Sequence, residues 1–197
     1  MSLTIEDLGG RVATVWSELR PATRGLVERA LQISGSSSLP SRNTPYDSRA
    51  DLELSRFLST LDDQASEARD VESQKRLRIV ADTCALVLQD KTQSAEVFVQ
   101  LVRRAQAQHD YKRIDALADA LTTRFAPSEI CELARSEDLF VRELANEALA
   151  RFPTGVLMSL LGDPVDTDVA RDALRRQVVE YGSEEARQIV NALQNFE

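Results

Sequence analysis

The stretch 138-DLFVRELANEALARFPTGVLMSLL-161 predicts two helices joined by a tight turn. Before Phe152, apolar residues recur at intervals of three and four, as they do along one face of a helix. Pro153-Thr154-Gly155 follows, and proline and glycine are typical of turns. The stretch therefore indicates a helical hairpin, and the rest of the chain can be compared with it.

The same pattern occurs once before this hairpin and once after it. Asp110, Asp138 and Asp166 are 28 residues apart, and each precedes a run with similar apolar spacing. The three first helices are expected over 111–125, 139–152 and 167–181, and the second helices over 128–135, 156–161 and 184–193. We expect Asp to cap each first helix, Ala and Leu to form a buried seam, and a terminal aromatic to close each layer. These aromatics are Phe125, Phe152 and Tyr181.

The residues of this region also resemble known helical repeats. Val141-Arg142, Ala145, Ala148 and Leu149 resemble the second-helix signature of HEAT-type repeats, and residues 127–164 are similar to the leucine-rich variant repeat. The resemblance covers roughly residues 110–196 and implies an α-solenoid with concave and convex faces, and it is only a weak indication of protein binding. The third copy departs from the pattern at Val169-Ala170-Arg171 and at Arg175-Arg176, and a polar last unit is expected of a cap.

The remaining chain is also expected to be helical. Only 7 Gly and 6 Pro occur, and helix-forming residues fill nearly every other stretch. We predict an N-terminal hairpin over 1–33, with helices over 5–19 and from Pro21, a Ser/Pro-rich loop or linker over 34–48, and central helices over 49–109. With the repeats at 110–197, this gives an all-α, solenoid-like stack of about 10–11 helices in one continuous body.

Several single residues have a structural and a functional interpretation. Trp16 lies on an apolar stripe, which favours a core anchor over a ligand platform. Tyr46, the one aromatic in the 34–48 loop, is either a partner contact or a plug that ties the loop to the body. Cys84 and Cys131 lie among apolar neighbours and are expected to be buried thiols of a cytoplasmic protein.

The net charge of −8 is concentrated in the repeat half. Residues 111–197 hold sixteen acids and ten bases, whereas residues 1–48 hold five of each. A negative net charge is unfavourable for general nucleic-acid binding and suits a basic protein partner. The alternative is that the surplus of acidic residues only keeps the protein soluble. The residues selected as candidate partner contacts are Glu143, Glu147, Asp168 and Asp172.

Basic residues form two clusters that suggest a different interface. The first is Lys75, Arg76 and Arg78, and the second is Arg103 and Arg104. Together they form a candidate patch for phosphate or nucleic acid, while the alternative is solvated faces balanced by nearby acids.

Motifs for catalysis are missing from the sequence. His109 is the one histidine and is expected to be a solvated residue before a helix, so His-based triads and zinc sites lack their parts. We expect no catalytic, cofactor or metal site, and no apolar run is long enough to span a membrane.

Three hypotheses for function follow. The favoured one is a non-enzymatic interaction module or adaptor with an acidic helical-repeat surface. The second is a helical-repeat enzyme, or a protein that handles a chromophore or small ligand. The third is a nucleic-acid binder that uses the basic clusters.

Overall fold

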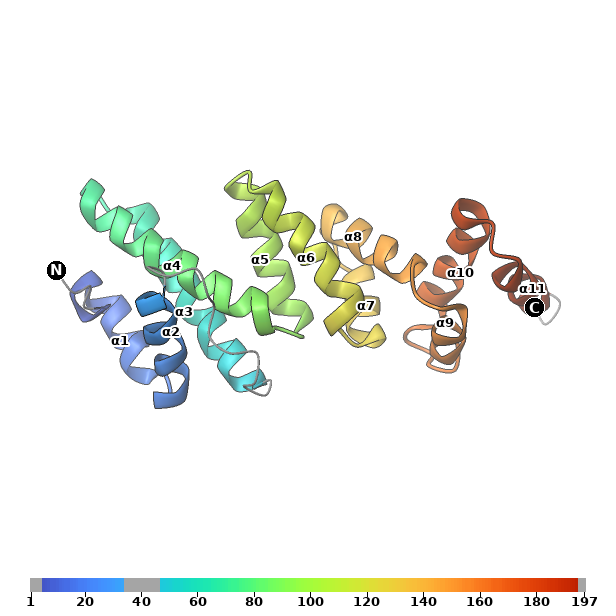
Figure 1. Cartoon of the computed structure of the whole chain (residues 1–197), viewed down its shortest axis with the longest axis horizontal. Coiled ribbons are helices and arrows are strands. Elements are labelled where there is room, and N and C mark those ends of the chain that lie inside the picture. The colour runs from blue at the N-terminus through green and yellow to red at the C-terminus, as the bar shows by residue number, and fades with distance from the viewer. Residues whose placement is uncertain (1–4, 34–46, 195–197) are drawn as a thin grey trace. The chain divides into compact units, whose positions relative to one another are not determined.

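The structure is a computed structural model that describes residues 5–33 and 47–194, and these residues form helices and no strand (Figure 1). A 3₁₀ helix, η1, comes first, and eleven α-helices follow. The bounds are η1 Ile5–Leu8, α1 Gly10–Glu18, α2 Pro21–Ile33, α3 Ser48–Glu67, α4 Val71–Lys91, α5 Ala95–Ala107, α6 Tyr111–Arg124, α7 Pro127–Ala134, α8 Leu139–Ala150, α9 Thr154–Leu160, α10 Thr167–Tyr181 and α11 Glu184–Gln194. The predicted all-α stack of about 10–11 helices is confirmed.

The chain divides into two compact units, Met1–Thr92 and Gln93–Glu197. The first unit contains η1 and α1 to α4, and the second contains α5 to α11. The repeat pattern predicts a boundary at residue 110, whereas the structure groups α5 with the helices that follow it. The expectation of one continuous body stays a prediction.

The first unit is built around the α3–α4 hairpin. Leu54, Phe57, Leu58 and Leu61 of α3 are fully buried, and α4 buries residues over much of its circumference, including Cys84. The Trp16 ring of α1 lies 5.3 Å from that of Phe57 between centroids. Trp16 is therefore a core residue, as the apolar stripe predicted.

The N-terminal helix is interrupted, contrary to the single helix predicted over 5–19. Gly9 has φ +122° and ψ 152°, and it separates η1 from α1. Side chains with a Cβ rarely adopt this backbone conformation, so glycine permits the break. The corner at Arg20 is confirmed, because α2 begins at Pro21, where the fixed φ of proline suits a first helical turn.

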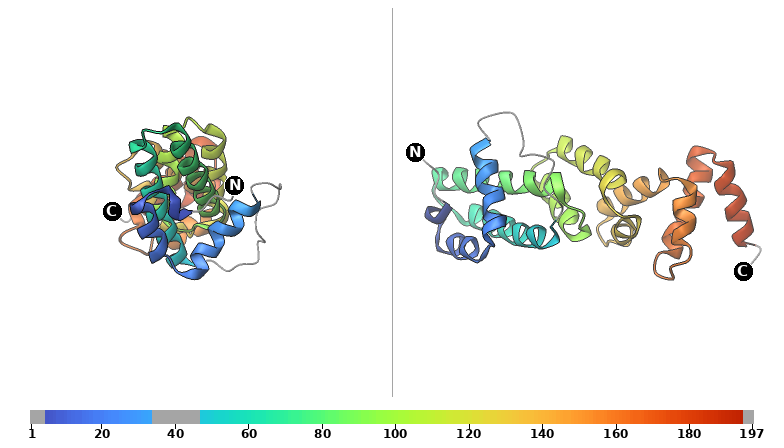
Figure 2. Two further views of the ribbon diagram at one scale, coloured as in Figure 1. Left: turned by 90° about the vertical axis from the view of Figure 1, so that its left-hand side faces the viewer. Right: turned by 60° about the horizontal axis from the view of Figure 1, so that its bottom comes forward.

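The helices predicted in the three repeats are present as α6 to α11, but of the predicted hairpins only α10–α11 packs as a close pair, which the right-hand view of Figure 2 shows in orange-red. In the other two repeats α7 packs on α8 and α9 packs on α10, rather than α6 on α7 and α8 on α9. The first helices α6, α8 and α10 contact one another in that order. Pro127 is the first residue of α7, and Gly182 ends α10 with φ +63°, in the left-handed region that favours glycine. Pro127 and Gly182 thus lie in turns between helices, as the repeat pattern predicted.

Two of the three repeat aspartates cap helices. Asp110 accepts the amide N–H of Arg113, and Asp138 accepts those of Phe140 and Val141. The cap predicted for Asp166 is wrong, because its side chain bonds to no amide of α10 and lies buried against Arg135 instead.

The aromatic at the end of each layer is also only partly as predicted. Phe125 is buried and meets Phe98 edge to face, with 5.5 Å between centroids. Tyr181 is instead 52% exposed, and its hydroxyl donates to Glu147 at 3.1 Å. A tyrosine hydroxyl needs a polar partner, which explains its position at the surface.

Among the described residues, no helix combines the length and apolar character needed to cross a bilayer.

Candidate functional site

The candidate acids of α8 lie one turn apart and are already bonded within the second unit. Glu143 accepts a hydrogen bond from Arg176 of α10 at 2.8 Å, and this bond lowers the pKa of Glu143. Glu147 accepts from Arg151 at 2.8 Å and from the Tyr181 hydroxyl. Both carboxylates keep solvent-facing area, so they connect α8 to α10 and still contribute negative charge to the surface.

The candidate acids of α10 are both exposed but differ in their partners. Asp172 pairs with Arg175, three residues later, at 2.9 Å. Asp168 is exposed, and within the described part of the chain it has no ion-pair partner. Asp168 is therefore more available to a partner than Asp172 is.

Two further acids were missed in the sequence, Asp115 and Asp119 of α6. They precede Glu143 and Glu147 by one 28-residue repeat, and both are exposed. Over the described residues neither carboxylate has an ion-pair partner. The repeat register was the signal that could have found them.

Exposed apolar residues lie at the N-terminal ends of the same helices. Tyr111 of α6 is 68% exposed and Leu139 of α8 is 67% exposed, and they are equivalent in the repeat. Phe140 and Val165 are also exposed nearby in the chain, at the starts of α8 and α10. Single exposed apolar side chains are common on proteins, but several that lie together can mark an interaction site.

The apolar and acidic residues share one side of each helix. Tyr111, Asp115 and Asp119 are spaced by four residues along α6, and Leu139, Glu143 and Glu147 repeat this spacing along α8. We call these six residues the α6–α8 face. Each helix thus presents one apolar side chain followed by two carboxylates.

The predicted basic clusters lie in different units, and their residues are not all exposed. Lys75 and Arg78 of α4 are exposed, and Arg76 bonds to Glu72 at 3.4 Å. In the second unit, Arg103 pairs with Asp138, while Arg104 is only 8% exposed. Arg104 follows Leu101 by three residues and so lies on the buried stripe of α5. Arg104 is therefore a buried residue, and the prediction that it belongs to a basic surface patch is wrong.

The other single-residue predictions are as follows. Tyr46 lies outside the described residues. Cys84 and Cys131 are buried free thiols, and burial raises the pKa of Cys131 to about 11. His109 is exposed with φ +55° between α5 and α6. The described residues contain no group of three or more His, Cys, Asp or Glu side chains arranged to hold a metal ion.

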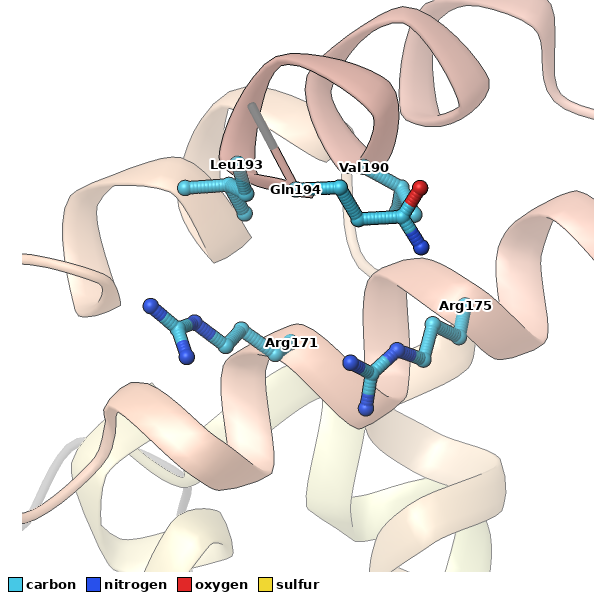
Figure 3. A pocket seen from close by; sticks show the side chains of 5 residues that line it. All are labelled: Arg171, Arg175, Val190, Leu193 and Gln194. Atoms are coloured by element: carbon cyan, nitrogen blue, oxygen red, sulfur yellow. The ribbon is translucent and has the colours of Figure 1, made fainter. Parts of the chain in front are cut away.

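A shallow hollow lies between α10 and α11 (Figure 3). Arg171 and Arg175 line one side, and Val190, Leu193 and Gln194 line the other. These arginines stand at the repeat positions that hold acids in α6 and α8, so the charge changes sign in the third layer. The hollow encloses about 10 Å³, which is about the space one water needs, so it is not a small-molecule site.

No protein family, curated protein or solved structure matches this chain.

Proposed function

We propose that the protein is a non-enzymatic interaction module or adaptor, and that the α6–α8 face binds a basic segment of another protein. The observation that carries this proposal is the repeated order of one exposed apolar residue and two carboxylates on two neighbouring helices. Charge complementarity favours a basic partner and would speed its association. The apolar residues Tyr111 and Leu139 would add contact area that excludes water.

Within the α6–α8 face, Asp115 and Asp119 are better placed to bind a partner than Glu143 and Glu147, which already bond to other side chains. A partner's Lys or Arg can meet Asp115 and Asp119 without displacing an internal ion pair, whereas Glu143 would first have to release Arg176. We therefore expect Asp115 and Asp119 to contribute most to partner affinity.

The resemblance to HEAT-type repeats is part of the proposal. The aspartate caps of α6 and α8, the proline or glycine turns and the contacts between successive first helices support a HEAT-like solenoid for the second unit. A cytoplasmic location is likewise proposed, and the two free, buried thiols support it.

Selection from a random peptide library tests this function. Immobilised wild-type protein is expected to enrich peptides that combine Lys or Arg with a large apolar residue. The double substitution Asp115→Lys/Asp119→Lys is expected to abolish that enrichment, because it places repulsive charges on the face. Failure to enrich any basic motif would contradict the proposal.

A matched control separates the face from net charge. Glu28→Lys/Glu67→Lys changes the net charge equally at exposed helical positions of the first unit. Enrichment should survive this control. If both double variants lose it equally, total charge and not the α6–α8 face controls binding.

A further inference from the structure

The first unit contains a pocket of about 150 Å³ between α2, α3 and α4. Its apolar wall comes from Leu26 of α2, Leu54 of α3 and Val87 of α4, together with Ala22 and Ala50. Ala50, Leu54 and Val87 are at most 7% exposed, so this wall is part of the core of the unit. An apolar cavity of about this volume can take up a molecule the size of benzene. The pocket therefore has room for a single ring.

The helices around the pocket are held together by polar contacts at one end. Arg20, just before α2, donates to Glu53 of α3 at 2.7 Å and to Asp47 at 3.0 Å. Thr23, itself fully buried, donates its hydroxyl hydrogen to the same Glu53 carboxylate. Both α2 and α3 also pack against α4. A ligand would therefore enter a site that is already formed, which lowers the cost of binding.

The charged groups around the pocket balance one another. Two cations and two carboxylates line it, namely Arg29, Lys91, Asp47 and Asp51. Arg20 adds no surplus of positive charge, because Asp47 and Glu53 share its guanidinium. Lys91 and Asp51 each already interact with other groups of the protein. The surroundings of the pocket thus favour neither an anion nor a cation.

This balance distinguishes between classes of ligand. An ion of either sign would lose hydration on entering, without a surplus of opposite charge to replace it. A carboxylate would also meet the Asp51 side chain, which is buried in the lining, and an ammonium group would meet Arg29 and Lys91. A neutral apolar molecule avoids these costs and gains free energy by leaving water for the apolar wall.

We propose that this pocket binds one neutral, apolar organic molecule, with a single ring or a short aliphatic chain against Leu26, Leu54 and Val87. A body of about six or seven carbons matches the volume. The pocket is independent of the α6–α8 face, because all its residues belong to the first unit. Loss of one binding activity therefore leaves the other unaffected.

Titration of the full chain with toluene, followed by methyl NMR, tests the proposal. We expect saturable binding at millimolar concentration or below, with shifts in the methyl signals of Leu26, Leu54 and Val87. Benzoate and benzylamine carry the same ring with a negative and a positive group. Each should bind about tenfold more weakly than toluene, because its charged group loses hydration without compensation. Binding of either ion as tight as that of toluene would overturn the assignment of a neutral ligand.

Substitutions that fill the pocket test where toluene binds. Ala50→Leu should remove binding, and Ala22→Leu, at an exposed position of the lining, repeats the test should circular dichroism show that Ala50→Leu unfolds the unit. Ala107→Leu is the matched control, because it adds the same side chain at an exposed position of α5 and should leave the affinity unchanged. The proposal is overturned by an absence of saturable toluene binding, or by full affinity in a folded filling variant.

Discussion

Asp138 and Asp166 occupy the same position in successive repeats, yet their surroundings differ. The Asp138 side chain is 19% exposed, caps α8 and pairs with Arg103 of α5 at 3.1 Å. The Asp166 side chain is 5% exposed, caps no helix, and pairs with Arg135 at 2.6 Å. One residue type at one repeat position thus stabilises the second unit in two ways.

Both sites share an ion pair that joins one helix to the third helix after it in the chain. Arg103 connects α5 to α8, and Arg135, at the end of α7, connects to α10. The two sites differ in the helix cap, which Asp138 provides and Asp166 does not. In the turn before α10, the Asp163 carboxylate accepts the Val165 amide at 2.8 Å. Asp166 accepts no amide of α10 with its side chain and faces Arg135 instead.

The largest expected effect is that of Arg135→Ala. It leaves the Asp166 carboxylate buried without its cation, which should cost about 3 kcal/mol of unfolding free energy. Urea unfolding at pH 7 measures this cost. Arg187→Ala removes an exposed pair of 2.7 Å to Glu184 and should change stability by less than about 0.5 kcal/mol. Equal losses in the two variants would show that burial of Asp166 has no special cost.

Asp166→Ala should cost less, about 2 kcal/mol, because Arg135 is 37% exposed and can turn to water. The same unfolding measurement checks this order. Asp166→Asn is the size-matched comparison, since it keeps hydrogen bonding but removes the charge. A loss larger than that of Arg135→Ala would contradict the assignment of Asp166 as the buried partner.

Asp138→Ala should cost about 1 kcal/mol at pH 7, the usual value for an N-cap. Burial alone would raise the pKa of Asp138, but hydrogen bonds from Arg103 and the Val141 amide lower it overall. The charged form therefore stabilises the folded state above the unfolded pKa, and this contribution is lost as pH falls through the lowered folded pKa.

The stability difference between wild type and Asp138→Ala should accordingly shrink below about pH 4. Urea midpoints measured from pH 7 to pH 2.5 follow this change. A difference that stays constant over the range would mean that the charge of Asp138 contributes nothing beyond its hydrogen bonds.

Local patterns in the sequence predicted much of the fold, whereas long-range partners could not be predicted. The 28-residue spacing predicted the helices α6 to α11, and Pro127 and Gly182 marked turns between them, because these features depend on near neighbours along the chain. The packing of α7 on α8 and of α9 on α10 depends on contacts between helices and was not predicted. The burial of Asp166 depends on Arg135, which lies 31 residues earlier, and no local sequence pattern predicts such a pair.

In the candidate site, long-range partners could again not be predicted, but two acidic residues that were missed could have been. The pairing of Glu143 with Arg176 is a tertiary contact and was not predictable. Asp115 and Asp119, by contrast, could have been found by moving Glu143 and Glu147 back one repeat. The burial of Arg104 was also predictable, since it continues the apolar stripe of α5.

The smallest expected effect is that of Arg103→Ala, at most about 0.5 kcal/mol. The Arg103 side chain is 61% exposed, and without it Asp138 still accepts two backbone amides of α8 and remains partly in contact with water. Urea unfolding beside Arg135→Ala measures the contrast between the two junctions, with helical content by circular dichroism as the check on folding. A loss near 3 kcal/mol would mean that Arg103 supports Asp138 as strongly as Arg135 supports Asp166, and burial would then not distinguish the two sites.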